Sequence, residues 1–179
     1  EILIYSLAAK YKPQIDLLLT VPGISTQLTA IRILAEIGAD MSVFETAKQL
    51  TSWAGLTPQN QESAGKKKTT RIGRAGAYLK PLLVQIALSC GKSDKSPELK
   101  NKYLALKKRR GGKKAVIAIA RKLLAAIWHI LSKNQPYNAD LYTSSDQTPV
   151  AREFTTAQAV AFLRGKGFVI VDGETGEVA

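Results

Sequence analysis

A serine followed by small residues and then by cations is the part of this sequence best suited to do chemistry. In "QESAGKKKTTRIGRAG", residues 61–76, Ser63 precedes Ala64 and Gly65, and five cations follow within nine residues: Lys66, Lys67, Lys68, Arg71 and Arg74. Attack of a serine hydroxyl on a phosphodiester requires a reachable oxygen, cations at the phosphate oxygens and a proton acceptor. Gly65 leaves room for a phosphate, and the cations would neutralise it. Local chemistry alone favours the simpler interpretation, a loop serine among lysines that bind backbone phosphate.

Other catalytic arrangements are poorly supplied. The one histidine, His129, lies in an apolar helical run beside Trp128, where we expect a packed, hydrogen-bonded side chain. The one cysteine, Cys90, excludes an internal disulfide and a Cys-based zinc cluster, and no acidic pair has metal-ligand spacing, so we predict no metal site in this chain. The proton acceptor for Ser63 stays open: Glu62, a lysine with a lowered pKa, or a group outside this sequence.

The net charge of +12 is concentrated in one stretch of the 179 residues. Residues 63–122 contain 18 basic and 2 acidic side chains, whereas residues 1–62 and 123–179 each contain 4 basic and 6 acidic ones. A concentrated basic field attracts a polyanion, and nucleic acid is the expected partner. The cluster Lys107, Lys108, Arg109 and Arg110, with Lys113 and Lys114, would extend that surface. We predict no membrane partner, because the apolar run 115–131 contains Arg121 and Lys122 and is short for a bilayer span.

The hydrophobic pattern predicts a mainly α fold with a basic loop and a small C-terminal α/β appendage. Residues 1–20 have heptad-like spacing, which predicts an amphipathic or coiled-coil-like helix. If this helix pairs with the same helix of a second copy, the protein is a homo-oligomer. Residues 17–133 form the main helical domain, with helices near 42–53, over 76–90, from Pro97 through Arg110, and over 113–133. Within it, Phe44, Leu50 and Trp53 have the spacing of core residues. Residues 134–152 read as a linker, and 153–179 as a helix followed by a strand at 168–171.

A proline–glycine turn between two helical segments predicts a helix–hairpin–helix element. Pro22 and Gly23 form the turn in "LLLTVPGISTQLTAI", and Ser25 stands where such elements usually have a second glycine. Backbone N–H groups of this kind of turn, with the following helix N-terminus, can hold a DNA phosphate.

Several motifs in order resemble one family. They are the "PGI" turn, "AEIG" followed by an acid and Phe44, "WAGLTP", the Ser–small–Gly–basic segment, and "RIG" ahead of a "YLKPLL" helix. This run, from Leu17 to Ala87 and more loosely to Leu131, resembles the C-terminal transposase domain of the insertion-sequence one-ten, one-sixteen and nine-zero-two family.

The resemblance implies a prokaryotic, cytoplasmic, nucleoid-associated DNA transposase or recombinase guided by an element-encoded structured RNA. It assigns the nucleophile that bonds to DNA phosphate to Ser63, although Ala64 separates that serine from Gly65. It also implies an N-terminal ribonuclease H-type domain whose carboxylates bind Mg²⁺, with no counterpart in these 179 residues, and no cofactor in this chain. Two rival hypotheses remain: a non-catalytic helix–hairpin–helix nucleic-acid-binding module, and a structural protein of the ribosome or nucleoid.

Overall fold

The chain forms two compact units, residues 1–139 and 140–179. The computed structural model describes residues 2–58, 61–63, 66–69, 71–73, 77–140, 156–169 and 171, and of the side chains in strands β1 and β2 nothing is described. The first unit contains α1 (Ile2–Ala8), η1 (Ala9–Tyr11), α2 (Lys12–Leu19), α3 (Gln27–Ile37), η2 (Met41–Val43), α4 (Ala47–Trp53), β1 (Gln61–Ser63), β2 (Lys66–Thr69), α5 (Leu79–Lys92), α6 (Pro97–Arg110) and α7 (Gly112–Lys133). The predicted mainly α fold is therefore confirmed.

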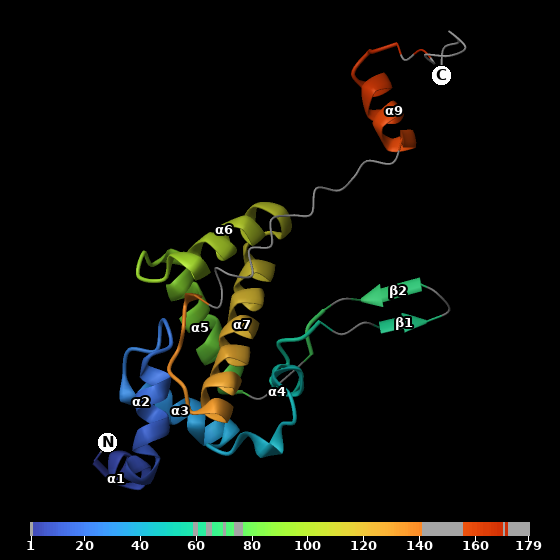
Figure 1. Ribbon diagram of the computed structural model, residues 1–179. Coiled ribbons are helices and arrows are strands. Elements are labelled where there is room, and N and C mark those ends of the chain that lie inside the picture. Colours follow the sequence, from blue (N-terminus) through green and yellow to red (C-terminus); the bar gives the residue numbers. More distant parts are fainter. Residues whose placement is uncertain are drawn as a thin grey trace. The chain divides into compact units, whose positions relative to one another are not determined.

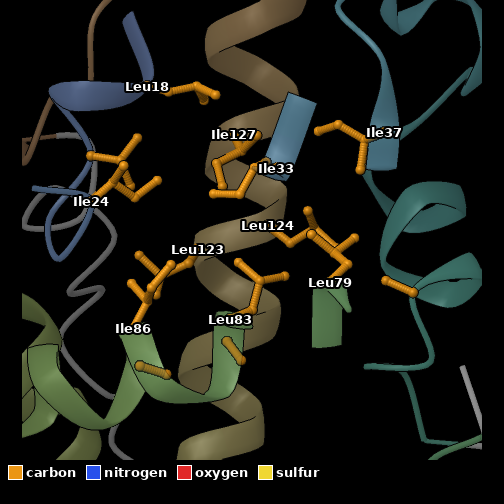
Figure 2. Close-up of a cluster of buried hydrophobic side chains, with 14 of the residues drawn as sticks. Leu18, Ile24, Ile33, Ile37, Leu79, Leu83, Ile86, Leu123, Leu124 and Ile127 are labelled. Carbon is orange, nitrogen blue, oxygen red and sulfur yellow. The ribbon is translucent and has the colours of Figure 1, made fainter. Parts of the chain in front are cut away.

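Helix α7 is the centre of the first unit. It packs against α2, α4, α5 and α6 (Figure 1). Apolar residues recur every three or four positions along it, so one face is continuously apolar. Figure 2 shows Leu123, Leu124 and Ile127 of α7 in a cluster with side chains of α2, α3 and α5. Each Leu or Ile buried in this way stabilises the fold by about 1.5–3 kcal/mol.

The predicted N-terminal helix is broken. A turn of 3-10 helix, Ala9–Tyr11, separates α1 from α2, and Pro13 lies in the first turn of α2. Of the heptad positions, Ala8, Ile15 and Leu18 are buried in the unit's own core, whereas Ile4 and Tyr11 are exposed. The core of the first unit therefore covers part of the apolar seam, and a coiled coil along residues 1–20 stays a prediction.

The turn between α2 and α3 packs on α5. Gly23 has φ +83°, and a Cβ at that position would lie 2.8 Å from both Cys90 Sγ and Ile86 Cγ2. The Cys90 thiol also donates a hydrogen bond to Pro22 O at 3.3 Å. The proline and glycine of this turn thus have a packing role whatever else they do.

Helices α5 and α6 approach closely through a second glycine. A Cβ on Gly91 would lie 2.8 Å from the ring of Tyr103, so only a residue without a side chain lets this ring lie on α5. Helix α6 begins at Pro97, which suits a first-turn position because its missing N–H has no helical partner there.

The polar segment after α7 begins within the first unit. Tyr137 donates a backbone N–H to Thr20 Oγ1 at 2.8 Å and its hydroxyl to Glu98 at 3.1 Å. These contacts dock the first residues of the stretch predicted as a linker. Its later part, 141–152, lies outside the described residues.

The second unit contains helix α9, Thr156–Gly165. After it, Phe168 and Val169 belong to no helix or strand, whereas Val171 is in a β-bridge, and Ile170 lies outside the described residues, so the strand at 168–171 stays a prediction. Phe162, Phe168 and Val171 are exposed.

Within the described ranges, α7 is the one helix long and apolar enough to cross a membrane. The helix has 22 residues, so it is longer than the apolar run 115–131, which was judged short for a bilayer span. Its apolar face is used in the core of the first unit.

Candidate nucleic-acid interface

Basic residues from three segments line one open groove along α7. Its volume is about 1280 Å³. The cations come from the segment after β2, the end of α6 and the first half of α7: Arg71, Arg110, Lys113, Lys114, Arg121 and Lys122. Apolar residues line the space between them: Leu56, Pro58, Ile72, Ile117, Ala118 and Ala125.

The helical repeat explains why α7 presents cations and apolar residues on this side. Lys114, Ala118, Arg121 and Ala125 are separated by four, three and four residues, so they share one face of the helix. Lys113 and Lys114 are exposed, whereas Arg121 is half-buried. The long stem of an arginine can lie on an apolar surface while its guanidinium stays in water.

The two acids of residues 63–122 are engaged near the start of α6. Asp94 pairs with Lys100, and Glu98 accepts the Tyr137 hydroxyl. From Glu98 to Lys107 the helix rises about 13 Å, which exceeds the Debye length of about 8–10 Å in physiological salt. Among side chains that the structure describes, no carboxylate pairs with Arg110, Lys113, Lys114 or Arg121. Their positive field is therefore available to a ligand.

Two of these cations also oppose the helix dipole. Lys113 and Lys114 occupy the first turn of α7, where the positive end of the dipole makes a cation unfavourable by about 0.3–1 kcal/mol. By contrast, Lys107 to Arg110 lie in the last turn of α6, where cations are favourable. The corner between the helices is open, since a Cβ at Gly111 or Gly112 would meet nothing within 4 Å.

Ser63 lies at the end of β1 in a two-stranded antiparallel hairpin. Its register partner is Lys66, and Glu62 pairs with Lys67. Strand β2 runs from Lys66 to Thr69. At the base of the hairpin, Pro58 and Ile72 form an isolated antiparallel bridge, and both residues line the groove. Five residues from Pro58 to Ser63 span at most about 18 Å, so the serine's backbone lies within that distance of the groove.

The structure brings together only part of the predicted basic surface. Arg71, Arg110, Lys113 and Lys114 line the groove, while Lys107, Lys108 and Arg109 lie exposed at the end of α6, with Lys107 Nζ 5.9 Å from the Tyr103 ring centre. For Lys66, Lys67 and Lys68 the structure gives strand β2 but no side-chain position. Gly65 and Arg74 lie outside the described residues.

The predicted hairpin turn is a separate feature. Pro22 and Gly23 pack toward α5, as described above, while Ser25 is exposed just before α3. Thr26 caps that helix by accepting from Thr29 N at 3.2 Å. Whether this turn is a helix–hairpin–helix element that holds a phosphate stays a prediction.

Sequence reasoning did not include Arg121 and Lys122 among the candidate binding residues, although both line the groove. Their spacing of seven and eight residues from Lys114 was a usable signal, but their position within an apolar run hid it. Two further expectations were wrong. His129 is exposed and contacts Trp128 edge-on at 4.9 Å between ring centres, and Trp53 is 53% exposed although Leu50 is buried.

Among the described residues, no three histidine, cysteine, aspartate or glutamate side chains lie close enough to hold a metal ion. Asp40 is engaged locally instead. Its carboxylate accepts from Ser42 N at 2.9 Å and from the Ser42 hydroxyl at 2.8 Å, and these bonds lower the pKa of Asp40.

The mainly helical first unit has an open basic groove beside a serine-bearing hairpin, and comparison with known proteins gives the family. Residues 15–104 match the model of the Transposase IS116/IS110/IS902 family. The chain belongs to this family.

Three relatives illustrate the similarity. The transposase for insertion sequence element IS1111A of Coxiella burnetii is 31% identical over 121 residues, covering 66% of this chain and 33% of that protein. The pilin gene-inverting protein of Moraxella bovis is 32% identical over 136 residues, 71% of this chain and 39% of its own length. A probable family 20 transposase of Pseudomonas aeruginosa is 28% identical over 127 residues, 69% and 37% of the two chains. The chain thus spans between a third and two fifths of these relatives' length.

Proposed function

We propose that this chain is the part of a DNA transposase or recombinase that binds DNA and supplies a serine nucleophile, Ser63. The observation that carries the proposal is the basic groove at the base of the hairpin that contains this serine, in a member of a transposase family. A relative named as a pilin gene-inverting protein supports recombination of DNA as the activity.

The proposed step is a transesterification. Ser63 Oγ bonds to a backbone phosphorus, the bond from that phosphorus to one sugar oxygen breaks, and the leaving sugar oxygen takes up a proton. The hydroxyl proton of Ser63 passes to Glu62, to a lysine with a lowered pKa, or to a group of another domain. Because the phosphate gains charge in the transition state, nearby cations stabilise it more than the ground state. The lysine opposite Ser63 in the register, Lys66, has its Cα about 5 Å away, as in any antiparallel pair.

Other components belong to the same proposal. A ribonuclease H-type domain with Mg²⁺ would complete the active site, an element-encoded RNA would select the DNA, and a homo-oligomer would hold two DNA sites. Since Ala8, Ile15 and Leu18 are buried within the chain, a dimer seam on α1 would use exposed residues such as Leu3 and Leu7.

The test is a search for a covalent protein–DNA adduct under denaturing conditions. The chain, joined to a ribonuclease H-type domain, is incubated with cognate DNA, Mg²⁺ and RNA from a related element. We expect an adduct that Ser63→Ala abolishes and that Ser52→Ala, an exposed serine in α4, retains. An adduct that survives Ser63→Ala moves the chemistry to another residue. Salt-sensitive DNA binding without any adduct would favour the non-catalytic binding module.

A further inference from the structure

We propose that the groove along α7 binds an unpaired DNA strand, with phosphates at Lys114 and Arg121 and bases against the apolar residues between them. This inference rests on the proposed function and names the form of DNA that the groove takes. It also adds Arg121, which lies within an apolar helix, to the binding surface.

The order of residues along the groove is the first argument. Exposed cations at Lys113 and Lys114 are followed by Ile117 and Ala118, then by Arg121, and then by Ala125. Polyanion binding by charge alone needs no apolar surface between the cations, and a charged phosphate loses hydration if placed against Ile117. A base has an apolar face that suits such a surface. The groove therefore alternates between sites for phosphate and sites for base.

The second argument is the state of the DNA. A duplex stacks its bases inside and exposes phosphates and base edges, so it cannot turn base faces toward Ile72 and Ile117. An unpaired strand can do so, and proteins that bind single strands combine a basic groove with surfaces that contact base faces. The surface here is aliphatic, so contact with the bases should be tolerant of sequence.

Dimensions agree with a short strand. Lys114 and Arg121 are seven residues apart, a helical rise of about 10 Å. From Lys113 to Ala125 the groove extends about 18 Å, so it holds only a short segment of a strand.

The position of the groove next to the hairpin indicates which strand it binds. Pro58 and Ile72, which join the two sides of the hairpin base, also line the groove. A DNA strand that leaves Ser63 along the hairpin therefore reaches this groove within about 18 Å. We assign the groove to the DNA strand that the serine attacks, and RNA binding there is an alternative outcome of the test.

The experiment compares two double variants that each remove two positive charges. Lys114→Gln with Arg121→Gln changes the groove, whereas Lys92→Gln with Lys133→Gln changes exposed lysines at the ends of α5 and α7. Fluorescence anisotropy measures binding of an oligodeoxyuridylate of about 12 nucleotides, of the same-length oligouridylate, and of a hairpin duplex of similar length, at salt concentrations on either side of the physiological value. Because Arg121 is half-buried, circular dichroism checks folding, and Lys113→Gln with Lys114→Gln provides a variant changed only at exposed positions.

We expect the groove variant to lose about tenfold or more in affinity for the unpaired DNA, and its salt slope to fall by about 1.4, since each single-strand phosphate contact contributes about 0.7. The Lys92/Lys133 control should change affinity less than about threefold, and duplex binding should be affected much less than single-strand binding. Equal losses in the groove variant and the control, or equal losses for duplex and single strand, would overturn the proposal. Tighter binding of oligouridylate through the same residues would also overturn it, because the two unpaired probes differ only in the 2′-hydroxyl.

The two proposals fail separately. If a Ser63 adduct forms but DNA binding does not depend on Lys114 and Arg121, the groove proposal is refuted and the proposal that Ser63 is the nucleophile stands. If unpaired DNA binds through the groove but no Ser63 adduct forms, the proposal that Ser63 is the nucleophile is refuted and the groove proposal stands.

Discussion

Gly23→Ala should destabilise the first unit for two reasons that can be measured separately. Alanine at φ +83° is strained, which costs about 1–3 kcal/mol. Its Cβ would also lie 2.8 Å from Cys90 Sγ and from Ile86 Cγ2, and neither atom is the end of a long flexible side chain. Overpacking of this kind adds about 1–3 kcal/mol.

Gly38→Ala is the matched control. Gly38 has φ +77°, so alanine is strained there too, but the nearest atom to its Cβ, Asp40 N, is 4.0 Å away. Urea denaturation should therefore show Gly23→Ala to be less stable than Gly38→Ala by about 1–3 kcal/mol. At about 2–4 °C per kcal/mol, the difference in Tm is about 2–12 °C.

A double-mutant cycle with Cys90→Ala identifies the cause. Removing Sγ relieves part of the overpacking in the Gly23→Ala variant but none of its backbone strain, so the two changes should couple by at least about 0.5 kcal/mol. Additive effects, together with equal losses for Gly23→Ala and Gly38→Ala, would refute the close packing of the turn on α5.

Two further predictions concern α7 and the buried thiol. Trp128→Phe removes the Nε1–H that donates to Phe44 O at 2.9 Å, so the free energy of unfolding in urea should fall by about 1–3 kcal/mol, whereas Trp53→Phe at an exposed position should change it by less than about 1 kcal/mol. Equal effects would contradict the role of that hydrogen bond. Burial raises the pKa of the Cys90 thiol from its ordinary 9.0, so the unfolded chain ionises first as the pH rises. The stability of the wild type relative to Cys90→Ala should thus be constant below about pH 8 and decline above about pH 9, and a difference that does not change between about pH 8 and pH 10 would count against it.

Much of the helical pattern was predictable because local signals set the helix ends. Pro97 begins α6 and the residue after Arg110 is glycine, as expected. Gly38 ends α3. The failures occurred where tertiary packing competes with local pattern. Trp53 has core spacing but lies at the end of a short helix that buries Leu50 instead, and three positions of the heptad-like pattern, Ala8, Ile15 and Leu18, are buried in the chain's own core.

The candidate site was predictable in its chemistry but only in part in its geometry. The order Ser63, small residues and cations, and the concentration of charge in residues 63–122, are properties of the sequence, and the resemblance of several ordered motifs gave the family that the comparison confirmed. These properties do not say which cations share a surface, since Lys107 and Arg110 both carry a positive charge and only Arg110 lines the groove.

The sequence by itself determined the helical class, the basic segment, its serine and the membership of a transposase family. Only the tertiary structure placed Arg71 and Arg121, fifty residues apart, on one groove, and Gly23 against Cys90. The physical reason is that residue type and spacing specify which face of a helix is apolar or charged. Which faces meet depends on how the whole chain packs its core around α7, a choice that no short stretch contains.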